Sequence, residues 1–476
     1  MDLETILPRL LGEHDVPGAV VGVVDGDGEP HVVTAGDRGA GRGPVDEDTV
    51  FAAASLTKPV FATGVLALVE AGALDLDRPL IEYVEEPYLP GDERAASITA
   101  RMVLSHTTGF PNWREDGPLF LRWPPGTRWG YSGEGYAYLQ RVVEHLTGAP
   151  IDRHLADAVL RPLDMHASSF AWRGDDDARV ALGHTADGEP QARSRSMGVK
   201  AAAGGLCTTG PDYVRFLVHS LGHGHRLFEP QVRIDGELAW GLGWGIEEHG
   251  DGGAVWQWGS DPGYKHFVVG RPNDRRGVVV FTNGARGALV YREVVRRVLP
   301  GPHPSLDTRQ RPRWLLATAG RPVDLQPRLD EPEVRALLEV PARRGEDLDR
   351  IADRYRDART RLLGVVVERS WDVPDVRPGT PIACLGLEPR GSDEADIRSL
   401  AVLPRWRRQG LARGLLFGAC EELGLRALEA ETDADAIAFY RATGFVVESR
   451  GERSPGVAPF RCRLELPLTG GRRRGS

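Results

Sequence analysis

The sequence predicts an α+β protein of more than one domain, and three observations carry this prediction. Its 476 residues exceed what one ordinary core holds, since domains usually have about 100 to 200 residues. Three strand-like runs with Gly- and Pro-containing turns between them, at residues 254–258, 266–270 and 278–282, predict an antiparallel meander. At residues 300–304 the chain reads Pro-Gly-Pro-His-Pro, and this change of composition predicts a domain boundary.

Helices and strands alternate before that boundary. Residues 3–14 have the pattern of a short amphipathic helix, and β-branched runs at 19–24 and 31–34 predict a hairpin that could join the meander in one sheet. Apolar residues at helical spacing then predict a helix that ends at Gly72. Pro59 is tolerated only in the first turn of a helix, so this helix should begin close to Ser55.

The chain is expected to divide into a first domain at residues 1–300, a linker at 301–330 and a second domain at 331–467, with a disordered tail at 468–476. The second domain should contain helices at 331–339 and within 347–360. Apolar strands are expected at 362–367, 382–387 and 397–402.

Composition limits the class of function. The net charge of −9 offers no footprint for nucleic acid or an anionic membrane, and no run approaches the ~18 apolar residues of a membrane span. Acidic residues follow Met1 where a secretory signal would be basic, so a cytoplasmic location is expected. The four cysteines have no C-x-x-C spacing and are expected to be reduced core residues, and no metal is expected. The oligomeric state stays open.

A hydroxyl and an amine stand three residues apart at Ser55 and Lys58, where the helix is expected to begin. Positions i and i+3 share a helix face, so Lys58 Nζ could take the proton of Ser55 Oγ if burial keeps the amine partly neutral. Only Lys58, Lys200 and Lys265 are lysines among 59 basic residues, and arginine cannot serve as a base. The alternative is a surface lysine beside an N-cap serine.

Two later motifs extend this pair. Ser55-x-x-Lys58, Tyr131-Ser132-Gly133 and Gln257-Trp258-Gly259, in this order, resemble the serine β-lactamase and penicillin-binding-protein superfamily, most closely its class C and esterase branch. The resemblance covers about residues 5–295 and includes the segments at 74–79, 104–109, 203–206 and 259–264. It implies a helical subdomain beside an antiparallel sheet flanked by helices, with the active site between them.

The resemblance also implies residue roles. Ser55 would be the nucleophile, Lys58 its partner and Tyr131 the proton shuttle, with Gln257 and Gly259 in the third motif. The backbone N–H groups of Ser55 and Ser260 would form an oxyanion hole, in which each donor is commonly worth about 3 to 4 kcal/mol. Taken alone, Tyr131 would be an ordinary buried aromatic residue. His106 is interpreted as a structural histidine that bonds its own loop.

Two departures from the family pattern bear on the substrate. Gly133 stands where the family usually has Asn, and it offers no amide to hold a substrate carbonyl. Gln257 stands where Lys or His is usual, so no charge is present to attract a substrate carboxylate. Both departures argue against efficient β-lactam hydrolysis and favour a neutral ester or amide. Four tryptophans could line an apolar pocket, although core packing is expected for at least half of them: Trp240, Trp244, Trp256 and Trp258.

A second pattern lies beyond residue 397. The strand ending in Leu400-Ala401-Val402 leads to Arg407-Arg408-Gln409-Gly410-Leu411-Ala412, which opens a helix and resembles motif A of the GNAT-type N-acetyltransferases. Successive N–H groups at a helix N-terminus can cradle a pyrophosphate, and Gly410 and Ala412 permit close approach. The resemblance therefore implies acetyl-CoA as co-substrate. In isolation the loop would read as a solvated basic turn.

Residues 438–445, Ala-Phe-Tyr-Arg-Ala-Thr-Gly-Phe, resemble the later helix-to-strand signature of the same family. This resemblance implies that Tyr440 protonates the departing thiolate. A general base should come from the strands before the loop, where Glu388, Glu394 and Asp396 remain alternatives.

The sequence thus predicts a bifunctional enzyme that acts on small molecules. One activity would be a serine acyl-enzyme hydrolase or transacylase, and the other an acetyl-CoA-dependent N-acetyltransferase. Their co-occurrence suggests successive steps on one metabolite. The competing hypothesis is a non-catalytic penicillin-recognition module coupled to a domain that senses CoA. Turnover of a simple ester would separate the two hypotheses.

Overall fold

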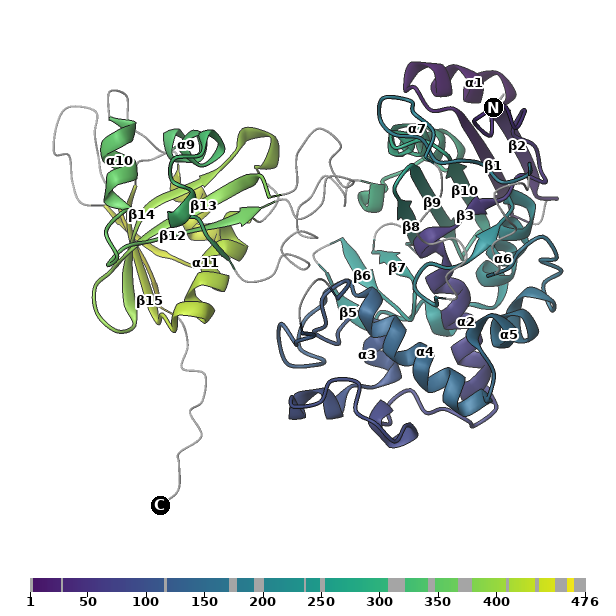
Figure 1. Ribbon diagram of the computed structural model, residues 1–476, viewed down its shortest axis with the longest axis horizontal. Helices are drawn as coiled ribbons and strands as arrows, with labels where there is room; N and C mark the ends of the chain where they lie inside the picture. The colour runs from purple at the N-terminus through teal and green to yellow at the C-terminus, as the bar shows by residue number, and fades with distance from the viewer. Residues whose placement is uncertain are drawn as a thin grey trace. The chain divides into compact units, whose positions relative to one another are not determined.

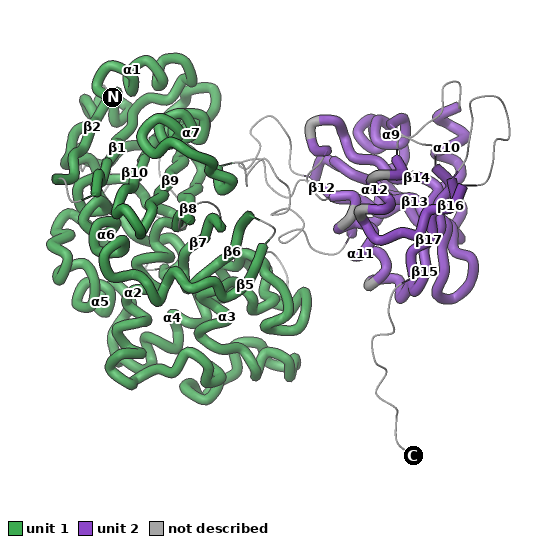
Figure 2. The backbone as a smooth tube through the Cα atoms, turned by 180° about the vertical axis from the view of Figure 1, so that it is seen from behind, with its two compact units in different colours: residues 1–307 green, residues 308–476 purple. Residues whose placement is uncertain are grey.

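The protein forms two compact units, residues 1–307 and 308–476, in a computed structural model (Figure 2). The structure describes residues 3–26, 29–114, 118–170, 178–191, 201–234, 237–248, 253–306, 322–340, 347–366, 379–407, 411–432, 436–449 and 460–465.

An antiparallel sheet of eight strands organises the first unit, in the order β2-β1-β10-β9-β8-β7-β6-β5 (Figure 1). The N-terminal hairpin joins the later meander because β1 pairs with β10, with Ala19 opposite Thr282. The predicted single sheet is therefore confirmed. Its strands are β1 (Gly18–Asp25), β2 (His31–Gly36), β5 (Val232–Arg233), β6 (Leu238–Trp240), β7 (Gly245–Glu247), β8 (Ala254–Asp261), β9 (Tyr264–Arg271) and β10 (Arg276–Thr282).

Helices cover both faces of this sheet. The helices α1 (Leu3–Glu13) and α7 (Gly287–Val298) contact each other and one face, and α6 (Gly210–His223) packs on β1 and β10 from the other. The sheet approaches α6 closely, since a Cβ at Gly22 would lie 2.1 Å from the Val214 side chain. Glycine at this strand position is what allows the contact.

A helical region adjoins the sheet. Its helices are α2 (Thr57–Glu70), α3 (Ala100–Leu104), α4 (Gly133–Thr147) and α5 (Ile151–Leu155). The short strand β3 (Phe51–Ala52) comes just before α2 in the chain, and it pairs with β4 (Cys207–Thr208). The buried apolar residues of α2 and α4, among them Phe61, Val65, Leu139 and Val142, share one core with residues of the sheet. Pro59 lies in the first turn of α2, as expected.

The first unit extends past residue 300. Glu247 of β7 is fully buried and accepts hydrogen bonds from His303 Nδ1 (3.0 Å), from Ser305 N (3.0 Å) and from Ser305 Oγ. Arg292 of α7 donates from Nε to Leu306 O (3.1 Å). Residues 303–306 are therefore docked on the sheet, and the boundary expected at 300 lies too early. The proline-rich composition concealed this docking.

The second unit has a sheet of seven strands in the order β11-β12-β13-β14-β15-β17-β16. Within the described ranges, β14 and β15 form a parallel pair, and the other neighbours are antiparallel. Arg398 is an extra residue in β14, because Ser399 faces Gly386 while Ile397 faces Leu387. Its strands are β11 (Val323–Asp324), β12 (Arg361–Val366), β13 (Pro381–Pro389), β14 (Glu394–Val402), β15 (Ala427–Thr432), β16 (Val446–Ser449) and β17 (Phe460–Glu465).

Two apolar clusters flank this second sheet. Helices α9 (Pro332–Glu339) and α10 (Leu348–Arg354) pack with Leu362 and Cys384 in one cluster. Helix α11 (Leu411–Leu423) and residues of α12 (Ile437–Ala442) belong to the other cluster, with Leu363 and Leu385. Adjacent residues of β12 thus enter opposite clusters, as the period of two in a strand requires.

The second unit also begins earlier than expected. Residues 323–324 pair with β12 as β11, a short 3₁₀ helix follows at Gln326–Arg328, and Leu325 is buried. The sequence assigned these residues to the linker at 301–330, because a strand of two residues has no periodic pattern by which it could be recognised. The four cysteines are free and buried. No helix within the described ranges is long and apolar enough to cross a membrane.

Candidate active sites

The backbone presents Ser55 from a tight connection between β3 and α2. Ala54 has a left-handed φ of 49°, an uncommon conformation for a residue with a side chain. Thr57 secures this turn, because its Oγ1 donates to Ala54 O (2.6 Å) and accepts from Leu206 N (3.1 Å). The serine is half-buried at the start of a short 3₁₀ helix, Ala54–Leu56, that runs directly into α2.

Lys58 is placed to act on the serine. Its Nζ lies 3.1 Å from Ser55 Oγ, and it donates to Ala203 O at 2.7 Å. The side chain is fully buried, and burial lowers the pKa of Lys58 to about 7. A large share of this amine is therefore neutral near pH 7 and able to accept a proton.

Tyr131 and Gln257 complete the surroundings of this pair. Gln257 is buried, and its Nε2 donates to Ser55 O and to the Tyr131 hydroxyl, both at 3.1 Å. Lys58 Nζ lies 4.9 Å from the centroid of the Tyr131 ring. The three motifs thus meet in space, and the neutral amide of Gln257 links the serine to the tyrosine.

The close approach of β8 explains Gly259. A Cβ at Gly259 would lie 2.6 Å from Ala53 O, so only glycine lets the strand lie against the segment before Ser55. The turn at Pro262-Gly263 makes Asp261 and Tyr264 the flanking pair of a two-residue hairpin. In such a hairpin the two flanking residues are hydrogen-bonded to each other through their backbones, and the pairs alternate along the strands. The next pair, Ser260 and Lys265, is therefore not hydrogen-bonded through its backbone. The N–H of Ser260 therefore points away from β9.

Ser260 has a further neighbour that sequence reasoning left without a role. Lys265 is buried, and its Nζ donates to Ser260 Oγ (2.7 Å). The protein thus has a second serine–lysine contact, between the neighbouring strands β8 and β9. Its only sequence signal is the scarcity of lysine in this chain.

His106 is structural, but its hydrogen bond differs from the expectation. Its Nδ1 accepts from Ser132 N (3.1 Å), at the start of α4 instead of within its own loop. Burial, and then the nearby Lys58 charge, hold the pKa of His106 well below its usual range. The neutral ring lies 4.2 Å from that of Tyr131, so His106 supports the tyrosine's position.

Core packing holds for at least half of the four tryptophans, as expected. Trp240, Trp244 and Trp256 are fully buried and pack in the core. Trp258 is half-buried, and its ring lies 4.8 Å from that of Tyr131.

In the second unit, β14 and β15 part where the cofactor site is expected. Their pairing covers Glu394 to Ile397, whereas β14 continues to Val402. The predicted residues Leu400, Ala401 and Val402 lie on this continuation. Where parallel strands part, their backbone N–H and C=O groups can bind an extended chain that carries amide groups.

The loop after β14 is described only in part. Arg407 donates from Nε to Val402 O (3.1 Å), and Leu411 and Ala412 open α11. Arg408, Gln409 and Gly410 lie outside the described residues. Tyr440, in α12, is buried, with its ring 5.0 Å from that of Phe445. Its expected role in protonating a thiolate stays a prediction.

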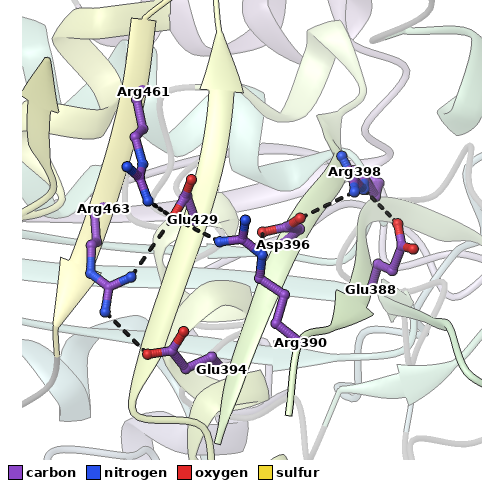
Figure 3. A network of polar contacts seen from close by, with 8 residues as sticks. All are labelled: Glu388, Arg390, Glu394, Asp396, Arg398, Glu429, Arg461 and Arg463. Atoms are coloured by element: carbon purple, nitrogen blue, oxygen red, sulfur yellow. Dashed lines mark hydrogen bonds and ion pairs between the residues drawn. The ribbon is translucent and has the colours of Figure 1, made fainter.

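A network of charged side chains crosses the strands of this sheet beside the parting (Figure 3). Arg390 lies between Asp396 (3.0 Å) and Glu429 (2.9 Å), which face each other in the register of β14 and β15. Arg398 contacts Asp396 (3.1 Å) and Glu388 (2.7 Å). The side chains of Asp396 and Glu429 are only 15% and 10% exposed.

The pKa values of the two facing carboxylates, Asp396 and Glu429, are shifted in opposite directions. Burial raises the pKa of Asp396 against the attraction of Arg390 and Arg398, and the charges of Glu429 and Glu388 raise it further. The hydrogen bond from Arg461 lowers the pKa of Glu429. The raised pKa makes Asp396 bind a proton more readily than an ordinary aspartate does. In the described ranges, no group of three or more His, Cys, Asp or Glu side chains could hold a metal ion.

Comparison with known proteins agrees with this division. Residues 3–299 match the β-lactamase family model, and residues 334–445 match the acetyltransferase (GNAT) family model. Penicillin-binding protein 4 of Amycolatopsis lactamdurans is 31% identical over 335 residues, which cover 60% of this chain and 86% of that protein. Esterase EstB of Burkholderia gladioli is 31% identical over 223 residues, 40% of this chain and 55% of the esterase. A solved D-alanine carboxypeptidase AmpC from Burkholderia cenocepacia has the same fold, with a TM-score of 0.54 at 22% identity over 63% of this chain and 98% of that one.

Proposed function

The chain belongs to the β-lactamase family through residues 3–299 and carries a GNAT acetyltransferase domain at 334–445, and on that premise we propose one reaction for each unit. The first unit would be a serine acyl-enzyme hydrolase or transacylase acting on a small ester or amide. The second would transfer the acetyl group of acetyl-CoA to an amine. A small-molecule substrate and a cytoplasmic location stay predictions.

One contact carries the first proposal, namely Lys58 Nζ at 3.1 Å from Ser55 Oγ, with the amine buried. Lys58 takes the proton as Ser55 Oγ attacks the substrate carbonyl carbon. As the scissile C–O or C–N bond breaks, Tyr131 gives its hydroxyl proton to the leaving oxygen or nitrogen and regains a proton from Lys58. The N–H groups of Ser55 and Ser260 hold the oxyanion. Water or an acceptor alcohol or amine then releases the acyl group from Ser55.

A labelling experiment tests this proposal. A fluorophosphonate probe is expected to label the full-length protein, and neither Ser55→Ala nor Lys58→Met should be labelled. Equal labelling of wild type and Ser55→Ala would refute Ser55 as the nucleophile. Turnover of p-nitrophenyl acetate then separates an enzyme from the alternative, a penicillin-recognition module that binds without turnover.

The absence of charge at Gln257 supports a neutral substrate group next to the scissile bond. Gln257 is an uncharged amide, and its Nε2 already donates to two protein oxygens. It therefore offers no positive charge to a substrate carboxylate. We therefore expect simple esters to be turned over faster than penicillins. A panel of p-nitrophenyl esters and a chromogenic cephalosporin would measure the difference.

The contrast between Asp396 and Glu429 supports the second proposal. Paired carboxylates whose pKa values are driven apart are typical of acid–base sites. Asp396 would take the proton of the attacking amine as the new C–N bond forms and the thioester C–S bond breaks. Tyr440 would protonate the departing thiolate.

Release of free thiol from acetyl-CoA, measured with a panel of amines, tests this reaction. Asp396→Asn is expected to lower kcat about 100-fold. Glu394→Gln is the matched control, because Glu394 lies on the same strand but contacts only Arg463 among its described ion pairs. Stabilisation of each variant by acetyl-CoA shows whether it is still folded. Full activity in Asp396→Asn would exclude this carboxylate as the base.

A further inference from the structure

Position 133 requires glycine because there is no room for a Cβ atom, and not because of the backbone φ angle. A Cβ at this position would lie 2.6 Å from Cη2 of Trp113 and 2.8 Å from its Cζ2 and Cζ3, closer than a real Cβ approaches any atom. Gly133 is not among the residues with a positive φ. The six-membered ring of Trp113 therefore fills the space into which a side chain at the third position of the Tyr131-Ser132-Gly133 motif would project.

Backbone hydrogen bonds fix the segment that carries this tryptophan. Gly133 N donates to both Asn112 O (2.8 Å) and Asn112 Oδ1 (3.0 Å), and Glu134 N donates to Asn112 O (2.9 Å). Ser132 Oγ donates to Pro111 O (2.8 Å). Two consecutive residues before Trp113 are thus bonded to the first turn of α4.

The residue after Trp113 is fixed as well. Arg114 donates from N (3.2 Å) and Nη2 (3.0 Å) to the carboxylate of Glu134, which also accepts from the Tyr88 hydroxyl (2.8 Å). With both neighbours held, the backbone of Trp113 is fixed beside Gly133. Gly133, against which its indole packs, stands two residues after Tyr131.

The indole is also open to solvent. Trp113 is 37% exposed, an unusual exposure for an aromatic residue packed against a helix start. A flat apolar surface therefore stands beside the motif that supplies Tyr131, where a polar side chain could otherwise reach a substrate. An aromatic face attracts apolar and aromatic groups and offers no hydrogen bond to a carbonyl along that face.

We propose that Trp113, packed on Gly133, determines the specificity of the Ser55 site by favouring esters or amides with an aromatic or bulky apolar group. This inference rests on the proposed serine hydrolase or transacylase function. It replaces the view that the motif has merely lost a side chain, because the vacant position is occupied by a side chain from another segment. The chemical class of substrate follows from that exchange.

Substrate pairs in the full-length protein test the proposal. One pair, p-nitrophenyl phenylacetate and p-nitrophenyl acetate, varies the acyl group, and a second pair, benzyl acetate and methyl acetate, varies the alcohol. Wild type should prefer the aromatic member of at least one pair in kcat/KM. Trp113→Ala should reduce that preference about tenfold, as expected when one apolar contact distinguishes substrates. An unchanged preference in both pairs would overturn the proposal.

The packing itself is tested by a double-mutant cycle. Gly133→Asn alone should lose stability and ester turnover, because its Cβ overlaps the indole. Adding Trp113→Ala should restore both, so that the effects of the two substitutions are strongly non-additive. Additive effects would contradict the claim that the two residues share one space.

Two controls make the outcomes distinguishable. Phe120→Ala removes another exposed aromatic residue of the same part of the chain, 49% exposed, and should leave the aromatic preference unchanged. An equal loss of preference in Phe120→Ala would overturn the assignment to Trp113. Labelling by the fluorophosphonate probe in every variant separates the two levels of inference. An unlabelled wild type refutes the serine mechanism, whereas labelled variants with unchanged preference refute only the role of Trp113.

Discussion

At the scale of single residues, burial gives Lys58 its chemistry. A solvated lysine is almost fully protonated at pH 7, but removal from water penalises the charged form and lowers the pKa to about 7. The sequence predicts the pair with Ser55 because both residues stand in one motif. It does not predict Ala203 O as the second acceptor of the amine, because a backbone carbonyl has no sequence signature.

This burial predicts the pH dependence of the serine site. Because the neutral amine is the base, kcat/KM for p-nitrophenyl acetate should rise with pH and level off above an apparent pKa of about 7. Lys58→Arg should lose activity at least about 1,000-fold at every pH, since guanidinium stays protonated. A rate that falls between pH 6 and 8 would contradict Lys58 as the base.

A second prediction at this scale concerns Gln257. Gln257→Met keeps the volume but removes the donor to Ser55 O and the Tyr131 hydroxyl, so kcat/KM should fall about 10- to 100-fold. Gln257→Glu should fall further and move the pH midpoint upward, because a nearby carboxylate favours the protonated form of Lys58. The pH profiles of both variants measure this shift. Identical midpoints in the two variants would show that the two side chains do not interact.

At the scale of secondary structure elements, boundaries marked by special residues are predictable from the sequence. Pro59 and Gly72 limit α2 because proline lacks a donor and glycine adopts φ 69° just after the helix ends. Short strands without such marks are not predictable, as β11 illustrates. The docking of 303–306 on β7 is equally hidden, because it depends on the buried carboxylate of Glu247, which lies more than 50 residues earlier.

The cap of α4 leads to a prediction about stability. Ser132 Oγ accepts from Gly135 N (3.0 Å) and donates to Pro111 O (2.8 Å), so it both caps the helix and holds the loop of Trp113. Ser132→Ala should destabilise the first unit by about 2 kcal/mol, combining a lost cap with an unsatisfied buried carbonyl. Calorimetry of the full-length protein would measure the change.

The matched control for this prediction is Ser97→Ala. The hydroxyl of Ser97 makes one described hydrogen bond, to Arg94 O in an exposed turn (2.9 Å). This substitution should change stability by less than about 0.5 kcal/mol. Equal effects of Ser97→Ala and Ser132→Ala would show that the bond to Pro111 contributes nothing.

At the scale of the whole molecule, the predicted pair of active sites corresponds to two separate cores. The buried residues of the first unit form clusters of their own, and those of the second unit pack around a different sheet. Each predicted site lies within one unit. The motifs could be recognised from sequence because each site draws on a few short segments, whereas the substrate surface at Trp113 depends on a contact between segments 20 residues apart.

Separate cores predict separate responses to ligands. In calorimetry of the full-length protein, acetyl-CoA at about 100 times its Kd should stabilise one transition by about 2.7 kcal/mol and leave the other in place. Fluorophosphonate labelling of Ser55 should move only the other transition. In Ser55→Ala, ester turnover should vanish while the acetyl-CoA shift is unchanged, and Asp396→Asn should leave ester turnover intact. If either ligand moves both transitions together, the stabilities of the two units are coupled, which would contradict independent unfolding of the two units.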